Sequence, residues 1–283
     1  MKTVSKIEDI RKELNKARMD GLRIGFVPTM GFLHEGHLSL VRKCRDENDI
    51  VVVSIFVNPA QFGAGEDLDS YPSDIKRDTA LLEAAGTNIL FLPEREEIYP
   101  EGFSTNISVA GVSDGLCGRS RPGHFDGVCT VVTKLLNIVQ PERAYFGEKD
   151  YQQLQVIKRL ARDLNIPSEI IGGSIIREDD GLAMSSRNVY LTPEQRESAL
   201  SLNRSFKVVQ DALKEGVEDV SELRADVEEF INSHEYARID YIEFVDPEFL
   251  RPVRKIEGDF LMALAVYVGK ARLIDNNYFE VQK

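Results

Sequence analysis

The sequence lacks an excess of basic charge, an even set of cysteines and any long apolar run. Its net charge is −12. Broad nucleic-acid or membrane-surface binding usually needs a basic face, so we expect neither partner, and an anionic ligand needs a local basic pocket. Cys44, Cys117 and Cys129 are an odd number, which reduced thiols in a cytoplasmic protein explain most simply. No N-terminal targeting pattern or membrane-length apolar run is present, so we expect a cytoplasmic protein.

The order of apolar segments predicts an α/β protein with a parallel sheet. Up to residue 176, apolar runs alternate with helical patterns, and Ile50 to Val57 is typical of a strand buried on both faces. Beyond Thr192, two helices followed by alternating strands indicate α+β structure, so we place a domain boundary near Arg177. Ser5 and Glu8 form a capping-box pattern for the first helix. Expected strands cover residues 22–27, 50–57, 88–92, 105–109, 144–146, 169–176, 239–245 and 260–268, and expected helices cover 5–17, 36–48, 74–85, 125–139, 151–164, 193–215 and 221–233.

The stretch from Val27 to His37 carries the first candidate site. An apolar strand pattern ends at Pro28, glycines allow a tight turn, and a helical pattern follows. His34 and His37 therefore lie where a strand leads into a helix N-terminus, whose unpaired N–H groups and partial positive charge favour phosphate. Imidazole donors there can stabilise charge on a reacting phosphate. A lone histidine here would favour a plain surface turn, whereas the pair favours a phosphate-binding site. A metal site is a second alternative, but no cysteine or third histidine lies nearby in the sequence.

Three further loops carry polar residues after expected strands. Gln61 follows the second strand and offers both donors and acceptors for hydroxyl and carbonyl groups. Lys149 follows the strand at 144–146 and can place a point charge on phosphate. Ser185, Ser186 and Arg187 can bind phosphate oxygens. Taken alone, each of these residues is more often a solvated loop residue, but Lys149 at such a junction favours a site.

Together these segments resemble the pantothenate synthetase (pantoate–β-alanine ligase) family of the HxGH nucleotidylyltransferases. The match spans about residues 22 to 195 and is dense in motifs, whereas the C-terminal third is less diagnostic. The matching motifs are Pro28-Thr29-Met30-Gly31, His34-Glu35-Gly36-His37, Phe56-Val57-Asn58-Pro59, Gln61-Phe62-Gly63, Arg121-Pro122-Gly123-His124-Phe125, Gly147-Glu148-Lys149-Asp150-Tyr151-Gln152-Gln153 and Asp180-Gly181-Leu182-Ala183-Met184-Ser185-Ser186-Arg187-Asn188.

The resemblance implies an ATP-dependent ligase with two steps. Pantoate and ATP give pantoyl adenylate and pyrophosphate, and β-alanine then attacks the acyl carbon to release pantothenate and AMP. It also implies Mg²⁺, whose protein ligands the sequence does not identify, and a homodimer. The implied fold is a Rossmann-like ATP- and pantoate-binding domain over residues 1–176 and a smaller α+β lid domain over residues 177–283.

The resemblance also implies roles for individual residues. It makes His37, His34, Lys149 and Arg187 catalytic, and it makes Gln61 and Gln153 the pantoate- and β-alanine-binding residues. The implied ATP-binding residues are Met30, Gly31, Phe32, Leu33, His34, Glu35, Gly36, His37, Gly147, Glu148, Lys149, Asp150, Ile176, Met184, Ser185, Ser186 and Arg187.

Three alternatives fit the sequence less well. A nucleotidyltransferase that joins a phosphorylated substrate to a nucleotide shares the first motif but does not explain the glutamine-bearing loops. A non-catalytic nucleotide-binding module predicts damage to the polar junctions, which all look intact. A tRNA synthetase would want a basic surface, which the net charge of −12 disfavours.

Overall fold

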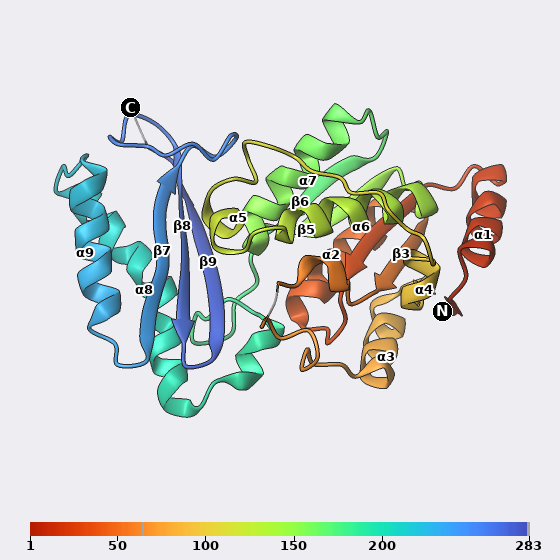
Figure 1. Ribbon diagram of the computed structural model, residues 1–283, viewed down its shortest axis with the longest axis horizontal. Coiled ribbons are helices and arrows are strands. Elements are labelled where there is room, and N and C mark those ends of the chain that lie inside the picture. Colours follow the sequence, from red (N-terminus) through yellow and green to blue (C-terminus); the bar gives the residue numbers. More distant parts are fainter. Residues whose placement is uncertain (64, 282–283) are drawn as a thin grey trace. The chain divides into compact units, whose positions relative to one another are not determined.

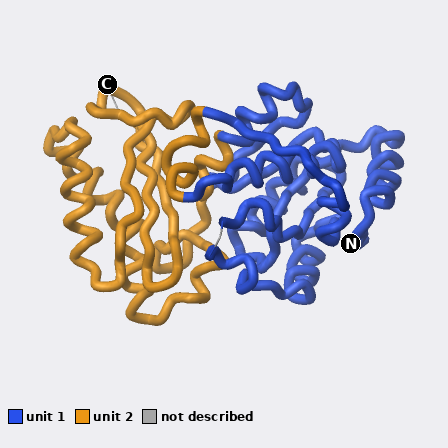
Figure 2. Tube along the Cα trace, viewed as in Figure 1, with its two compact units in different colours: residues 1–110, 121–148, 156–174 blue, residues 111–120, 149–155, 175–283 orange. Residues whose placement is uncertain are grey.

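The computed structural model describes residues 1–63 and 65–281 and divides into two compact units (Figures 1 and 2). Unit 1 comprises Met1–Ala110, Arg121–Glu148 and Val156–Ser174, and unit 2 comprises Gly111–Ser120, Lys149–Gln155 and Ile175–Lys283. The chain passes from unit 1 into the last segment of unit 2 between Ser174 and Ile175, close to the predicted boundary between residues 176 and 177. Two short segments that precede this boundary, Gly111–Ser120 and Lys149–Gln155, also belong to unit 2. The assignment of one domain to ATP and pantoate and the other to a lid stays a prediction.

Unit 1 contains a six-stranded sheet in which every pairing is parallel, which confirms the predicted α/β class. The strands are β1 (Lys2–Val4), β2 (Ile24–Thr29), β3 (Ile50–Ile55), β4 (Ile89–Phe91), β5 (Arg143–Gly147) and β6 (Glu169–Gly173). Their order is β1-β4-β3-β2-β5-β6. The order reverses between β2 and β5, and ligands of open α/β sheets bind beyond the carboxyl ends of strands at such a reversal.

Helices cover this sheet because apolar side chains on both of its faces need partners. The helices are α1 (Ile7–Met19), α2 (Glu35–Glu47), α3 (Ile75–Ala85), α4 (Arg95–Ile98), α6 (His124–Val139) and α7 (Tyr151–Asp163), whose first residues belong to unit 2. α2 packs against β2, β3, β5 and α3, and α6 packs against β2 and α1. A Cβ at Gly25 would lie 2.4 Å from the Cys44 Sγ, so this glycine lets α2 approach β2 closely.

Unit 2 contains an antiparallel sheet and a separate apolar core. Its sheet is formed by β7 (Ala237–Val245), β8 (Phe260–Val268) and β9 (Ala271–Phe279), and its helices are α5 (Leu116–Ser120), α8 (Pro193–Lys214) and α9 (Val220–Asn232). α8 and α9 pack against the sheet and share a buried cluster with it (Figure 1). The predicted start of α8 is confirmed: Thr192 and Gln195 form a reciprocal capping box, with Pro193 at the first helical position.

Two predictions about local structure were wrong. Ser5 does not cap α1; the N-cap is Lys6 without a side-chain cap, and the Ile7 N–H instead donates to Glu97 Oε1 at 2.9 Å. Residues 105–109 do not form a strand, and the Ile107 N–H donates to Thr130 Oγ1 at 3.0 Å rather than to a neighbouring strand. In addition, β1, α4, α5 and β9 were not predicted from the sequence.

The three cysteines are free and buried. Burial raises the pKa of the Cys44 and Cys129 thiols to about 12, so both stay protonated and pack as apolar groups. Within residues 1–63 and 65–281, none of the helices combines the length and the apolar character that crossing a membrane demands.

Candidate functional site

The strand order of unit 1 brings three candidate segments to one edge of the sheet. β2 pairs with β3 on one side and with β5 on the other, all in parallel. The His34–His37 motif follows β2, Gln61 follows β3, and Gly147 and Glu148 end and follow β5. Carboxyl ends of parallel strands point the same way, so the sheet gathers segments that lie far apart in the sequence, from His34 to Glu148.

His34 and His37 form a reciprocal cap at the start of α2. The His34 backbone N–H donates to His37 Nδ1 at 3.3 Å, and the Gly36 N–H donates to His34 Nδ1 at 3.2 Å. The two ring centroids lie 4.0 Å apart. The His37 N–H is also taken, by the His34 carbonyl at 2.9 Å. The expectation of unpaired N–H groups was therefore wrong for these three groups, and phosphate binding at this helix start stays a prediction.

The cap fixes the tautomer of both imidazoles. A ring nitrogen that accepts an N–H bond carries no proton, so a neutral ring in this position has its proton on Nε2. His34 and His37 both use Nδ1 as the acceptor. Each ring is therefore an Nε2–H donor, and the side chains, rather than the helix N–H groups, supply the donors of the motif.

Gln61 is held by a buried network that fixes the orientation of its amide. It belongs to η1 (Pro59–Gln61), and its Oε1 accepts from Asn58 Nδ2 at 3.1 Å while its Nε2 lies 3.0 Å from Met30 Sδ. Asn58 Nδ2 also donates to the Gly127 carbonyl, and Asn58 Oδ1 accepts from Tyr99 Oη at 2.8 Å. Burial raises the pKa of Tyr99 to about 12, so the phenol keeps the proton that it donates. Gln61 is thus oriented with its oxygen toward Asn58.

A second set of contacts fixes the backbone of the same loop. Arg121 makes a bidentate pair with Glu66, with distances of 2.7 and 2.6 Å, and its Nη2 donates to the Gln61 carbonyl at 3.3 Å. His124 Nδ1 lies 2.8 Å from that carbonyl, so it carries the proton, and its Nε2 accepts from Arg121 Nη1 at 3.1 Å. Burial alone raises the pKa of Glu66, but the hydrogen bonds and charge of Arg121 outweigh it and lower the pKa below its usual value.

Lys149 is the first candidate residue along the chain that belongs to unit 2. It lies in η2 (Glu148–Asp150), and its carbonyl accepts from Asn276 Nδ2 at 2.9 Å. The neighbouring Asp275 is buried and takes a bidentate pair from Arg177, at 2.7 and 3.0 Å. β9 therefore holds both the backbone of Lys149 and the base of the segment that leads to Ser185.

The Met184–Arg187 segment leaves a narrow turn closed by the antiparallel Arg177–Ala183 bridge and enters a 3₁₀ helix. The Met184 N–H donates to the Ile176 carbonyl at 3.0 Å, and Ser185 Oγ caps η3 (Ser186–Tyr190) by accepting from the Arg187 N–H at 3.2 Å. Ser186 is buried. Unit 2 thus contains Lys149, Asp150, Gln153, Ile176 and Met184–Arg187, and unit 1 contains Met30–His37, Gln61, Gly147 and Glu148.

The two glutamines of α7 have different surroundings. Gln152 is buried; its Oε1 accepts from the Cys117 N–H at 2.9 Å, and its Nε2 donates to the carbonyls of Val112 and Gly115 at 3.0 and 2.8 Å. Gln153 is only half-buried. Gln152 therefore organises the loop before α5, and the substrate-binding role of Gln153 stays a prediction.

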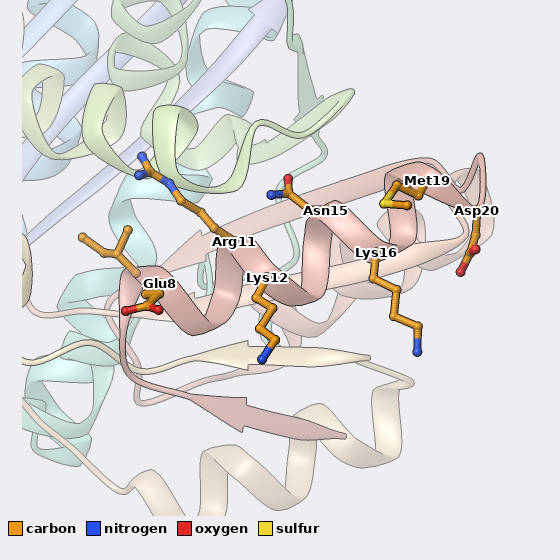
Figure 3. Close-up of a pocket in the computed structure, with 8 residues that line it drawn as sticks. Glu8, Arg11, Lys12, Asn15, Lys16, Met19 and Asp20 are labelled. Carbon is orange, nitrogen blue, oxygen red and sulfur yellow. The ribbon is translucent and has the colours of Figure 1, made fainter.

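Figure 3 shows a surface hollow along α1, and none of the residues that line it is a candidate site residue. It is lined by one helix and the residue after it, with side chains of both charges: Ile7, Glu8, Arg11, Lys12, Asn15, Lys16, Met19 and Asp20. Small-molecule sites usually combine an apolar lining with convergent polar groups from several elements. The hollow is not the candidate site.

Metal ligands are not clustered in the described part of the chain. Residues 1–63 and 65–281 contain no group of three or more His, Cys, Asp or Glu side chains that could hold a metal ion. A cation that accompanies a nucleotide does not need such a cluster, because Mg²⁺ is commonly held by phosphate oxygens, water and one or two carboxylates.

The reversed parallel sheet and the His-x-Gly-His helix start define a Rossmann-like α/β protein of the nucleotide-binding class. The sequence model of the family described as pantoate-beta-alanine ligase matches residues 2–278. A pantothenate synthetase of Caldicellulosiruptor bescii is 53% identical over 282 residues, covering 100% of both chains. The chain belongs to the pantoate–β-alanine ligase family.

Solved structures agree with this membership. A pantothenate synthetase from Thermus thermophilus has a TM-score of 0.93 at 48% identity, covering 98% of this chain and 99% of that chain. A pantoate-beta-alanine ligase from Francisella tularensis, solved in complex with beta-gamma ATP and β-alanine, has a TM-score of 0.80 at 37% identity. That comparison covers 98% of this chain and 97% of the Francisella chain.

Proposed function

We propose that this chain condenses pantoate with β-alanine, using ATP, to give pantothenate, AMP and pyrophosphate through pantoyl adenylate. The observation that carries the proposal is the pair of Nδ1-capped imidazoles, His34 and His37, at the carboxyl end of β2. Both rings are Nε2–H donors, which suits a phosphate that gains charge during reaction. The substrates in this proposal are taken from the pantoate–β-alanine ligase family, to which the chain belongs.

In the first step, a carboxylate oxygen of pantoate bonds to the α-phosphorus of ATP, and the bond from that phosphorus to the bridging oxygen of pyrophosphate breaks. The carboxylate has no proton to lose at neutral pH, so the step needs charge stabilisation rather than a base. His37 and His34 donate to the reacting phosphate. Lys149 and Arg187 supply positive charge, and the hydroxyls of Ser185 and Ser186 add neutral donors.

In the second step, the neutral amine of β-alanine attacks the acyl carbon of pantoyl adenylate. A C–N bond forms, the C–O bond to AMP breaks, AMP leaves with the electron pair of that bond, and the nitrogen gives up a proton to water as the amide forms. We assign Gln61 and Gln153 to the hydroxyl and carbonyl groups of pantoate. The network around Asn58 supports this role for Gln61, because it leaves the amide with a single orientation.

The remaining ATP contacts of the proposal come from short segments around the same motifs. They are Met30, Gly31, Phe32, Leu33, Glu35, Gly36, Gly147, Glu148, Asp150, Ile176 and Met184, with Ile176 beside the adenine. Mg²⁺ would accompany the triphosphate and offset its charge, held mainly by phosphate oxygens and water. We further propose a homodimer in the cytoplasm; free, buried cysteines fit a reducing compartment.

Isotope exchange between pyrophosphate and ATP tests the reaction directly. We expect exchange that depends on pantoate and proceeds without β-alanine. The reason is that the first step, the formation of pantoyl adenylate and pyrophosphate, is reversible and does not involve β-alanine. Exchange that requires β-alanine, or none at all in an enzyme that makes pantothenate, would contradict the adenylate route.

The lid role of the C-terminal segment has a separate test. An acyl adenylate exposed to water is hydrolysed before an amine arrives, so a shielding segment keeps AMP and pantothenate equal. Arg187→Ala should weaken ATP binding and give AMP in excess of pantothenate. A ratio that stays at one while the KM for ATP rises would leave Arg187 as a phosphate ligand only.

A further inference from the structure

Asp78 on α3 is a buried carboxylate that the proposed reaction does not use. It is fully buried, and its two oxygens accept successive backbone N–H groups of the first motif: Phe32 N–H to Oδ2 at 2.6 Å and Leu33 N–H to Oδ1 at 2.8 Å. The carboxylate lies 46 and 45 residues away from these partners in sequence. Charge-assisted bonds of this length are the stronger kind of hydrogen bond.

The position of this carboxylate disfavours direct binding of a ligand and favours a structural role. We use the term brace for its two hydrogen bonds to the Phe32 and Leu33 N–H groups. A buried negative charge beside a motif that acts on phosphate would oppose ATP unless it were compensated. The two N–H groups and the Arg77 guanidinium, at 3.7 Å from Oδ1, provide that compensation. Because both oxygens are engaged and inaccessible, the side chain fits neither a base nor a metal ligand.

The backbone that Asp78 holds is strained. Phe32 has φ of 49°, in the left-handed region that residues with a Cβ rarely adopt. Gly31, with φ of 85°, precedes it, and a Cβ at Gly31 would lie 3.3 Å from Asp78 Oδ2. His34, the N-cap of α2, comes two residues after Phe32. The carboxylate thus stabilises a turn whose exit sets the position of the His34 ring.

We propose that Asp78 is a positioning residue that holds the Phe32–Leu33 turn and thereby aims the Nε2–H groups of His34 and His37. The effect on catalysis rests on the proposed function, in which these rings donate to the reacting phosphate. The structural part does not, because it concerns only the turn and the two rings.

Asp78→Asn tests the brace with almost no change of shape. The amide keeps one acceptor but presents an NH₂ group to the second backbone N–H, so the turn must shift. Asp74→Asn is the matched control on the same helix: Asp74 caps α3 by accepting from the Arg77 N–H at 3.0 Å, and asparagine caps equally well. Displacements of about 1 Å around a reacting group reduce turnover by about 10²-fold.

The expected kinetic result is a fall in kcat of about 10- to 100-fold for Asp78→Asn, with a smaller change in the KM for pantoate and no change for Asp74→Asn. In ¹⁵N spectra of the imidazoles, the His34 and His37 signals should move, while His124 and His234 serve as internal references. A folded Asp78→Asn protein with wild-type kcat and unmoved signals overturns the proposal. So does a lower melting temperature with unchanged kcat, which is what a purely structural role would give.

Hydrogen exchange of the wild-type protein keeps the proposal testable if Asp78→Asn does not fold. The amides of Phe32 and Leu33 should be protected to the level of the central strands, although they lie in a turn. Fast exchange at both amides would overturn the brace. Full turnover in His37→Ala, with the ring signals still displaced in Asp78→Asn, would instead remove the proposed role of the histidine and leave the brace intact.

Discussion

Gly127 on α6 controls how closely the Gln61 loop can approach that helix. A Cβ at this position would lie 2.2 Å from the Ala60 carbonyl oxygen and 2.6 Å from the Gln61 nitrogen. Both neighbours are backbone atoms, which cannot rotate away as a side chain can. The Gly127 carbonyl also accepts from Asn58 Nδ2 at 3.1 Å, so the loop and the helix are bonded at the same point. We therefore predict that Gly127→Ala displaces Gln61.

The size of the effect follows from the distances. Non-bonded heavy atoms are comfortable at about 3.5 Å, so a contact of 2.2 Å requires the loop to move by about 1 Å. Overpacking of this kind costs about 1–3 kcal/mol, and replacing glycine by alanine inside a helix returns about 1 kcal/mol. The fold should survive a net loss of up to about 2 kcal/mol. A shift of about 1 Å at a substrate-positioning residue, however, costs about 10²-fold in rate.

The assay is steady-state kinetics with pantoate and ATP varied separately, together with thermal unfolding. We expect kcat/KM for pantoate to fall by about 10- to 100-fold, and the KM for pantoate to rise by much more than the KM for ATP. Gly258→Ala is the control, because a Cβ there meets nothing within 4 Å. A folded Gly127→Ala enzyme with wild-type kcat/KM for pantoate would refute the reasoning, and equal rises in the KM for pantoate and the KM for ATP would refute the assignment of Gln61 to pantoate.

Three further predictions concern single side chains. His37→Ala should lower turnover by about 10²–10³-fold without unfolding the protein, and full turnover in a folded variant would exclude the donor role. Gln153→Ala should raise the KM for pantoate by about 5- to 150-fold, the equivalent of about 1–3 kcal/mol for an unpaired polar group, while Gln152→Ala should mainly lower the melting temperature. The pKa of Glu66 is lowered in the fold, so its pair with Arg121 contributes stability above the pKa of the unfolded state and loses it as pH falls through the folded-state pKa. Glu66→Gln should therefore lower the melting temperature at pH 7, and this effect should shrink steadily as the pH falls below the usual pKa of a glutamate; an effect that does not change with pH would count against the pair.

The local sequence determined elements whose signals lie within a few residues. The β-branched run at Ile50–Ile55 is a central parallel strand, and α3 begins at Asp74 as its N-cap and ends at Gly86 in the left-handed conformation, as the residue types predict. The start of α2 between His34 and His37 was also predicted, because the turn and the helical pattern that follows it are local features of the sequence. Each of these features depends on backbone sterics, on helix capping or on the spacing of apolar residues. All three are determined by residues that are close together in the sequence.

The tertiary structure decided what depends on partners far away in the chain. Ser5 and Glu8 have the residue types of a capping box, yet the N–H of Ile7 bonds to Glu97. Residues 105–109 have strand composition but find no strand to pair with, because a strand needs a neighbour that composition cannot supply.

The same distinction holds inside the candidate site. Sequence motifs identified the two histidines and Gln61 as polar groups at strand ends, because those types and spacings are local. The proton positions on the rings, the single orientation of the Gln61 amide and the bonds from the motif to Asp78 depend on atoms that folding brings together from 45 or more residues away or across a helix turn. Hydrogen bonds are directional, so only the folded backbone decides which donor meets which acceptor.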